Sequence, residues 1–240
     1  MTAVLKLIES RQSVRALYDS RRPVAKEHLR KILEAGRWAP TPHNMQNFEI
    51  LIVDDKELLE SLGNIRYPIT DRFIEENRQN LSLSEEELLR KKVGLLGTHF
   101  PPALRTPGVK LDDTTYEEVR SGWRKAIQSS PVLGIVVYHP EKRAPDSEGD
   151  FLGVIGLGCV LENMWLMAHS LRICFHVISV LNREPAEKEV KGVLGIPEHL
   201  KVAFSFRLGY ALPSATRQVR VRRDLKDFTH HNRFGNPLLE

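Results

Sequence analysis

Four short apolar segments, separated by stretches of helical periodicity, constrain the fold of this chain most. They cover residues 48–54, 132–138, 173–181 and 201–211. Their Val, Ile, Leu and Phe content is typical of buried β-strands. Helices are predicted over residues 3–10, 24–37, 56–62, 116–128, 151–171 and 185–194. Strands interleaved with helices predict an α+β or α/β sheet that is covered on both faces.

Residues 151–171 are predicted to form the longest helix, which is too apolar for a surface helix. Its first half contains Gly153, Gly156 and Gly158. Each glycine inside a helix costs about 1 kcal/mol relative to alanine, so three of them indicate close approach of another helix or of a ring system. The glycine order differs from that of the dinucleotide-binding fingerprint, which excludes that interpretation.

The section from residue 64 to residue 122 has the weakest periodicity. Ser84 and Glu87 have the spacing of a capping box, which predicts a helix from residue 84 to residue 96. The prolines and glycine of residues 98–114 predict a loop. This section is expected to be either a lid over a pocket or an elaboration on the solvent side.

Length and composition indicate one soluble domain. A chain of 240 residues is long enough for a single domain that buries roughly 70–75% of its unfolded surface, and no linker or repeat divides it. The net charge of +4 is mild and its basic residues are interleaved with acidic ones, so no nucleic-acid partner is expected. The N-terminus has no secretory apolar region and no apolar run reaches 18 residues, so we expect a cytoplasmic protein without a membrane partner.

The cysteines and histidines do not predict a metal site. Cys159 and Cys174 lie in apolar surroundings without a C-x-x-C motif, which predicts buried structural thiols. The nine histidines are scattered and show no metal-ligand spacing, so we expect no metal.

Two polar stretches near the N-terminus suit an anionic ligand. In the first, Arg11 and Arg15 flank Ser13, and a guanidinium group binds phosphate through two donors at any working pH. In the second, Pro40 and Pro42 exclude helix and predict an extended loop of few conformations, which costs little entropy to hold against a ligand. Residues 220–223 add positive charge, either for the same ligand or as a solvated basic tail.

Taken together and in this order, these stretches resemble a known family. Arg11-x-Ser13-x-Arg15, followed by Ala39-Pro40-Thr41-x-x-Asn44-x-Gln46-x-Phe48, is similar to the two boxes of the nitroreductase family of FMN-dependent oxidoreductases. The resemblance covers roughly residues 3–60 and 120–235 and implies an α+β fold: a mixed, largely antiparallel sheet flanked by helices, in an intertwined homodimer. Residues 1–240 would form one FMN-binding domain, with 64–122 as an atypical insertion and 212–240 as a C-terminal arm around the partner.

The resemblance also implies roles for individual residues. Arg11 and Ser13 match the phosphate ligands of the family, with Gln12 in place of its second arginine, and Arg15 matches a basic residue beside the pyrimidine edge of the flavin. Arg220 and Arg222 match a basic pair that completes the phosphate site. The residues that match the loop reaching the flavin from the partner subunit are Pro40, Thr41, Asn44 and Gln46. The residues that match the backbone amides facing flavin N5 and O4 are Val177, Ile178, Ser179 and Val180.

The reaction that the resemblance implies needs no catalytic side chain, because flavin N5 carries the chemistry. Hydride would pass from NAD(P)H to FMN and then, in ping-pong order, to an electron-poor small molecule such as a nitroaromatic or a quinone. Alternatives are a specialised member (a reductive dehalogenase, a dehydrogenase or a flavin-fragmenting enzyme) and a flavin-binding or basic-surface protein without turnover.

Overall fold

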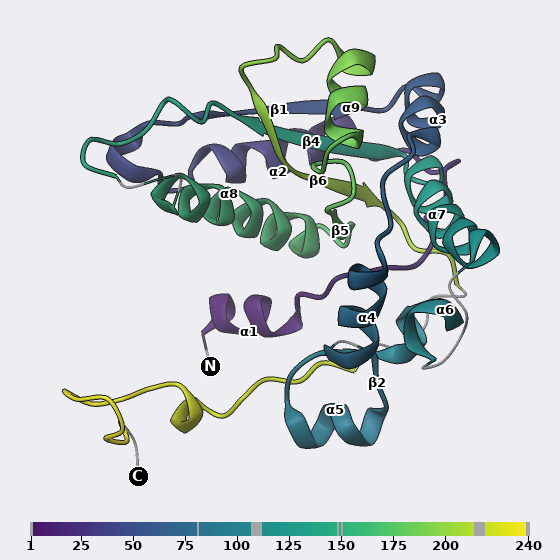
Figure 1. The fold of residues 1–240 in the computed structure, drawn as a ribbon. Helices are drawn as coiled ribbons and strands as arrows, with labels where there is room; N and C mark the ends of the chain where they lie inside the picture. The colour runs from purple at the N-terminus through teal and green to yellow at the C-terminus, as the bar shows by residue number, and fades with distance from the viewer. Residues whose placement is uncertain are drawn as a thin grey trace. The chain divides into compact units, whose positions relative to one another are not determined.

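The computed structural model describes residues 2–80, 82–106, 112–147, 149, 151–213 and 219–238. The chain divides into two compact units: residues 1–68 with 120–215, and residues 69–119 with 216–240 (Figure 1). The section expected as an insertion and the section expected as an arm therefore fall largely in the second unit. Whether the whole chain acts as one domain stays a prediction.

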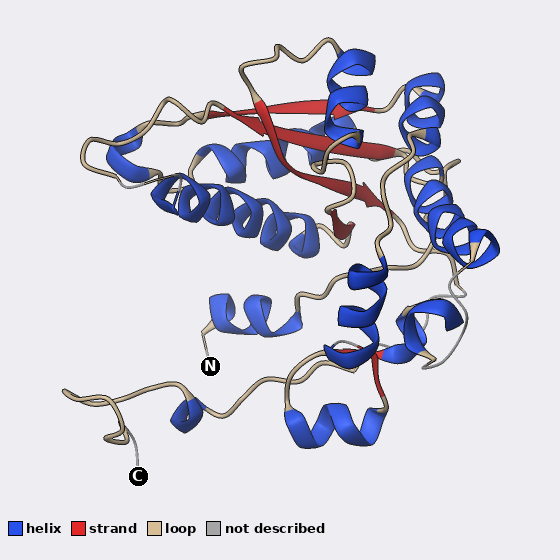
Figure 2. Cartoon of the chain, viewed as in Figure 1, coloured by secondary structure: helices blue, strands red, loops and turns tan. Residues whose placement is uncertain are grey.

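The first unit is built on a four-stranded antiparallel sheet (Figure 2). In spatial order the strands are β1 (Phe48–Val53), β4 (Val132–Tyr138), β6 (Lys201–Gly209) and β5 (Cys174–Ile178). All four predicted strands form, which confirms the largely antiparallel sheet. Three of them are shorter than expected, because β1 ends at Val53, β5 covers only Cys174–Ile178 and β6 ends at Gly209.

Five of the predicted helices lie wholly in this unit. They are α1 (Ala3–Ser10), α2 (Lys26–Arg37), α3 (Lys56–Asn64), α8 (Phe151–Ser170) and α9 (Ala186–Leu194). A sixth, α7 (Asp113–Gln128), contributes its residues from Arg120 onward. The predicted bounds differ from the observed ones by at most three residues at each helix end.

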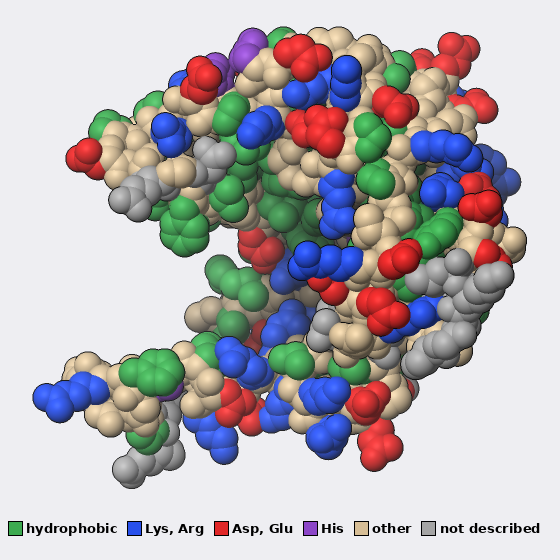
Figure 3. All heavy atoms as spheres, viewed as in Figure 1, with side chains coloured by type: hydrophobic (Ala, Val, Ile, Leu, Met, Phe, Trp, Pro, Cys, Tyr) green, Lys and Arg blue, Asp and Glu red, His purple; other side chains and the backbone are tan. Residues whose placement is uncertain are grey.

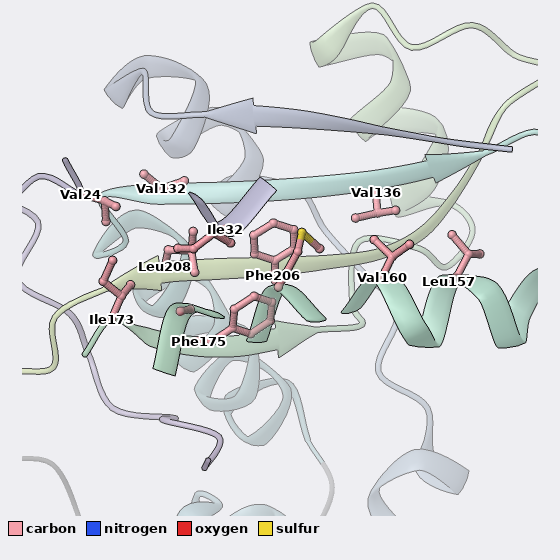
Figure 4. Packing of buried hydrophobic residues seen from close by; sticks show 12 residues of the cluster. Val24, Ile32, Val132, Val136, Leu157, Val160, Ile173, Phe175, Phe206 and Leu208 are labelled. Atoms are coloured by element: carbon pink, nitrogen blue, oxygen red, sulfur yellow. The ribbon is translucent and has the colours of Figure 1, made fainter. Parts of the chain in front are cut away.

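The core lies between one face of the sheet and the helices α2 and α8 (Figure 4). Phe206 of β6 stacks on Phe175 of β5 at a centroid distance of 4.8 Å. A Cβ atom on Gly134 of β4 would lie 2.2 Å from the Phe206 ring, so this position requires glycine. The next residues along β4, Leu133 and Ile135, are also fully buried, which shows that the other face of the sheet is covered as well.

The glycines of α8 differ in how closely other residues approach them. A Cβ atom on Gly156 would lie 3.2 Å from the ring of Pro42, so the expected close approach is present there. A Cβ atom on Gly158 would have no described atom of the same chain within 4 Å, so one chain shows no close approach at this glycine. Among the described residues α8 is the one helix long and apolar enough to cross a membrane. A single such helix is weak evidence for a membrane span, and the inner face of α8 packs in the core against α2.

The second unit is built from short elements. They are α4 (Asp71–Asn80), β2 (Ser82–Leu83), α5 (Glu85–Lys91), β3 (Leu95–Leu96), η2 (Gly97–His99), α6 (Pro102–Arg105) and η3 (Leu225–Asp227). The strands β2 and β3 form a parallel pair. The arm contacts the rest of this unit through an ion pair between Lys92 and Asp224.

Two expectations about this section are corrected. The Ser84 capping box is present, but its helix ends at Lys91 instead of continuing to residue 96, because Lys92 takes a left-handed φ of 55°. The stretch expected as a loop contains η2, α6 and the start of α7. Its residues 107–111 lie outside the described residues.

Candidate functional site

The residues of the first basic stretch lie along the open edge of the sheet. We call residues 11–18 the edge segment. The amide of Val14 donates a hydrogen bond to the carbonyl of Phe175 in the edge strand β5, at 3.2 Å. Tyr18 forms an isolated antiparallel bridge with Ala211, just beyond β6. The edge segment is thus fixed beside the last two strands of the sheet.

Arg11 follows α1 and lies against α8. Its Nε is 3.1 Å from Oε1 of Glu162, and its guanidinium lies 4.4 Å from the ring centre of Trp165. The Trp165 indole in turn donates to the carbonyl of Gln12 at 3.3 Å. The Arg11 side chain is 18% exposed, so its cation reaches the surface while it is paired with Glu162. A phosphate would have to compete with Glu162 for this guanidinium.

Arg15, four residues further along the edge segment, is half-buried. Its burial lowers the pKa of the guanidinium from the ordinary value, yet an arginine remains charged at neutral pH. Ser13, between the two arginines, is half-buried, and Gln12 is exposed. The edge segment therefore presents two cations and one hydroxyl, the donor set expected for an anion.

Beneath the edge segment lies a buried arginine, Arg207 of β6, that the sequence analysis missed. It is fully buried, and its Nη2 donates to the carbonyl of Ala16 in the edge segment at 2.6 Å. Its Nη1 donates to the carbonyl of Ala126 in α7 at 3.0 Å, and the group lies 4.1 Å from the ring centre of Tyr18. The available signal was a lone charge within the apolar run of β6, since charged residues are almost never fully buried without partners.

His176 of β5 completes this buried group, which consists of the side chains of Arg207, Tyr18 and His176. Its Nδ1 accepts the Nε–H of Arg207 at 3.1 Å. Burial first, and then the charges of Arg207 and Arg15, hold the pKa of His176 well below its usual range. The imidazole is therefore neutral with its proton on Nε2. The ring of Trp123 in α7 lies parallel to it at 6.1 Å.

The backbone of β5 offers an amide toward the edge segment. Successive residues of a strand direct their backbone groups to opposite sides, and the Phe175 carbonyl points to the open edge. The N–H of Val177 therefore points to the same edge, as the expected role of an amide facing flavin requires. By the same alternation the amide of Ile178 points toward β6, and beyond β5 Ser179 is exposed whereas Val180 is buried.

The loop of residues 40–47 is held by its own hydrogen bonds. Thr41 Oγ1 accepts the amide of Gln46 at 3.2 Å, and the Gln46 side chain donates to Oδ1 of Asn44 at 3.0 Å. Residues 42–44 form the short 3-10 helix η1 (Pro42–Asn44), so the expectation of a fully extended loop is wrong for them. Proline suits the first position of a helical turn, where its missing N–H is not needed.

This loop also carries backbone strain and polar groups. Asn44 and Gln46 take φ values of 53° and 43°, in the left-handed region that non-glycine residues rarely adopt. Both side chains are exposed, and Pro40 is exposed as well. Such strain is typical of binding sites, where the surrounding structure maintains it.

Within one chain the loop and the edge segment lie apart. The loop packs at Gly156, near the start of α8, whereas the edge segment contacts Trp165, nine residues further along that helix. Nine residues of α-helix span about 14 Å. One copy of the chain thus does not bring these two predicted parts together.

Arg220 and Arg222 lie in the second unit, within residues 219–224. Both side chains are exposed, and Arg222 donates to the carbonyl of Val221 at 2.7 Å. Their expected meeting with Arg11 around one phosphate stays a prediction. The two cysteines are half-buried free thiols rather than buried ones, and burial raises the pKa of the Cys174 thiol.

A four-stranded antiparallel sheet flanked by helices, with an arginine-bearing segment along its open edge, defines an α+β protein with a candidate anion site. The model of the nitroreductase family matches residues 8–210. The chain therefore belongs to the nitroreductase family.

Solved structures share this fold at low sequence identity. An FMN-dependent nitroreductase from Clostridium difficile is 20% identical, with 96% of this chain and 99% of that chain covered and a TM-score of 0.59. A nitroreductase with bound FMN from Bacteroides fragilis is 24% identical, with 93% and 96% covered and a TM-score of 0.57. A nitroreductase family protein from Clostridium novyi is 15% identical, with 99% and 97% covered and a TM-score of 0.57.

Proposed function

We propose that this chain is a cytoplasmic FMN-dependent oxidoreductase that transfers hydride from NAD(P)H to an electron-poor small molecule, such as a nitroaromatic or a quinone. The observation that carries the proposal is the edge segment, which presents Arg11 and Arg15 beside the edge-facing amide of Val177. FMN, when bound, supplies the centre that accepts and donates hydride.

The donor set fits this cofactor. Arg11 and Ser13 would hold the phosphate, because a permanent cation and a hydroxyl are good phosphate donors. Arg15 would lie at the pyrimidine edge, where positive charge favours the reduced, anionic flavin. Two similar structures support the assignment: the Clostridium difficile protein is FMN-dependent and the Bacteroides fragilis protein holds FMN. The use of NAD(P)H rests on the family resemblance.

A homodimer is the second part of the proposal. In α1 the apolar residues Val4, Leu5 and Ile8 are exposed, and in α8 Phe151 and Val154 are 71% and 56% exposed. Figure 3 shows hydrophobic side chains along the surface where α8 lies. Exposed apolar faces of this kind are typical of protein–protein interfaces, and we assign this one to a second copy of the chain.

Such a dimer would complete the site. The loop of residues 40–47 and the edge segment lie apart on one copy, so the loop of one copy would serve the flavin of the other, together with the arm of residues 212–240. Basic and acidic side chains are mixed on the face shown in Figure 3, which suits a small-molecule substrate better than a nucleic acid.

The test is anaerobic stopped-flow mixing of the FMN-loaded protein with NADH and with NADPH. Rapid bleaching of the flavin absorbance, followed by recovery on addition of a quinone, is the expected result. Tight FMN retention without bleaching by either nucleotide would contradict the NAD(P)H-dependent reaction and favour a specialised or non-catalytic flavoprotein.

A further inference from the structure

The proposed function leaves the buried group around Arg207 without a role. Among the described residues, the hydrogen-bond acceptors of Arg207 are the Nδ1 of His176 and the carbonyls of Ala16 and Ala126. None of these acceptors is a carboxylate. A buried charge that is compensated only by neutral acceptors is expensive, and an apolar side chain of similar volume is often more stable in such a place. Stability alone is thus a poor explanation of this arginine.

The three hydrogen bonds of Arg207 join three separate elements. One reaches β5, one reaches the last turn of α7, and one reaches the edge segment at Ala16. Because a guanidinium is planar, its donors fix these three acceptors in one plane and at set distances. The edge segment thereby has its position defined relative to β5 and α7.

Tyr18 adds a second attachment of the same segment. Its ring lies 4.1 Å from the Arg207 guanidinium, and its hydroxyl donates to the carbonyl of Val14 at 2.9 Å. Residues 14–18 therefore form a turn that is closed by the Tyr18–Val14 hydrogen bond and that contacts Arg207 through the Tyr18 ring and the Ala16 carbonyl. Arg15, the cation expected at the flavin, lies within this turn.

We infer that Arg207 is the positioning residue of the flavin site: its guanidinium holds the edge segment, and with it Arg11, Ser13 and Arg15, at the place beside β5 where FMN binds. This inference rests on the proposed function. Arg207 itself does not touch the flavin, since it is fully buried beneath the segment.

The test compares Arg207→Met and Arg207→Lys with the wild-type protein in their affinity for FMN and for riboflavin. Riboflavin lacks the phosphate, so the ratio of the two dissociation constants measures the phosphate contacts. Both variants should raise the Kd for FMN by about tenfold or more and bring the ratio of the two dissociation constants toward one. The loss of a hydrogen bond to a charged group accounts for a large part of a tenfold change in Kd. Lysine should fail although it keeps the charge, because it cannot reach three acceptors in one plane.

The matched control is Lys191→Met in α9. Lys191 is also buried and donates to a backbone carbonyl, that of Glu198, at 3.3 Å. Its loss should lower the stability of the protein without changing the ratio of the two dissociation constants. A purely structural role of Arg207 predicts the same behaviour for both sites, with FMN and riboflavin affected alike.

Three outcomes would overturn the inference. In the first, the folded Arg207 variants have the same Kd for FMN, and the same ratio of the FMN and riboflavin constants, as the wild type. In the second, Arg207→Lys restores both values fully. If the Arg207 variants do not fold, Tyr18→Phe decides, since it removes only the bond to Val14. It should raise the Kd for FMN about threefold, the effect of one neutral hydrogen bond, and an unchanged Kd is the third contrary outcome. A wild-type protein that binds no FMN would instead contradict the proposed function, and the inference with it.

Discussion

At the scale of single residues, the candidate site is a set of cations in different surroundings. Arg11 is paired with Glu162 at the surface, and Arg15 is half-buried. Arg207 is fully buried and donates its hydrogen bonds to neutral acceptors. The first two could be predicted from the sequence, because an R-x-S-x-R box is a local pattern. Arg207 and His176 could not, because their partnership joins two strands that are distant in the sequence and depends on their register.

Arg11→Ala should abolish FMN retention while leaving a folded protein in its proposed dimer, because it removes the proposed charge-assisted contact to the phosphate. A loss of about 2–3 kcal/mol, or a Kd for FMN raised about thirtyfold or more, is expected. The measurement is the flavin content after gel filtration together with a fluorescence titration. Lys31→Ala, which removes an exposed cation paired with Glu27 in α2, is the matched control and should retain the flavin. A yellow Arg11→Ala protein would count against the phosphate assignment.

His176 should make the stability of the apoprotein depend on pH. Its pKa in the folded state lies well below 6.5, the value expected when it is unfolded. As the pH falls below 6.5 the unfolded state binds a proton that the folded state does not, so the free energy of unfolding decreases, by at most about 1.4 kcal/mol per pH unit from this group. Above pH 6.5 this contribution is fully present.

Urea unfolding of the wild type and of His176→Gln at pH 7.5 and pH 5.5 measures this term. The two proteins differ only at residue 176, so the difference between their two losses of stability belongs to His176. The wild type should lose more stability than the variant on acidification. Equal losses would show that the imidazole is not held neutral by burial beside Arg207 and Arg15.

At the scale of elements, apolar periodicity was enough to predict the sheet and the helices of the first unit. The capping box at Ser84 was predicted from four residues and is present. The helices α4 and α6 were missed, because α4 is mostly polar, with only two apolar residues, and α6 is a single turn within a proline-rich stretch. Strand and helix ends differ where the backbone leaves regular geometry, as at Lys92, whose left-handed φ has no local signature in its side chain.

The packing of the sheet predicts a strong effect at Gly134. Gly134→Ala places a Cβ atom 2.2 Å from the Phe206 ring, so the ring or the strand must move. We expect a loss of about 3 kcal/mol, the upper part of the range for overpacked cores. Thermal and urea unfolding give this value.

The matched substitution is Gly192→Ala in α9, where no described atom lies within 4 Å of the added Cβ. There the better helix propensity of alanine should stabilise the protein by up to about 1 kcal/mol. A Gly134→Ala protein as stable as the wild type would show that β4 and β6 do not approach as closely as described.

At the scale of the whole molecule, the apolar faces of α1 and α8 give the proposed dimer its interface. Val154→Glu should therefore produce monomers, since Val154 is 56% exposed in one copy and its replacement does not disturb the core. The flavin content should fall with the dimer, because the loop of residues 40–47 would no longer reach the second site. Sedimentation velocity reports the oligomeric state.

Val193→Glu in α9 is the control for this prediction. Val193 is also a half-exposed valine on a helix, at 38%, but it lies away from the proposed interface. The control protein should remain dimeric and yellow. A Val154→Glu protein that stays a flavin-containing dimer would place the interface elsewhere on the chain.

The central claim is that the edge segment of one copy and the loop of another enclose FMN. Sedimentation velocity of the freshly purified protein, recorded both in the protein absorption band and in the visible flavin absorption band, tests it most directly. We expect a single boundary at the mass of a dimer, carrying about one FMN per chain. A monomer that sediments without any flavin absorbance, even after incubation with excess FMN, would contradict it.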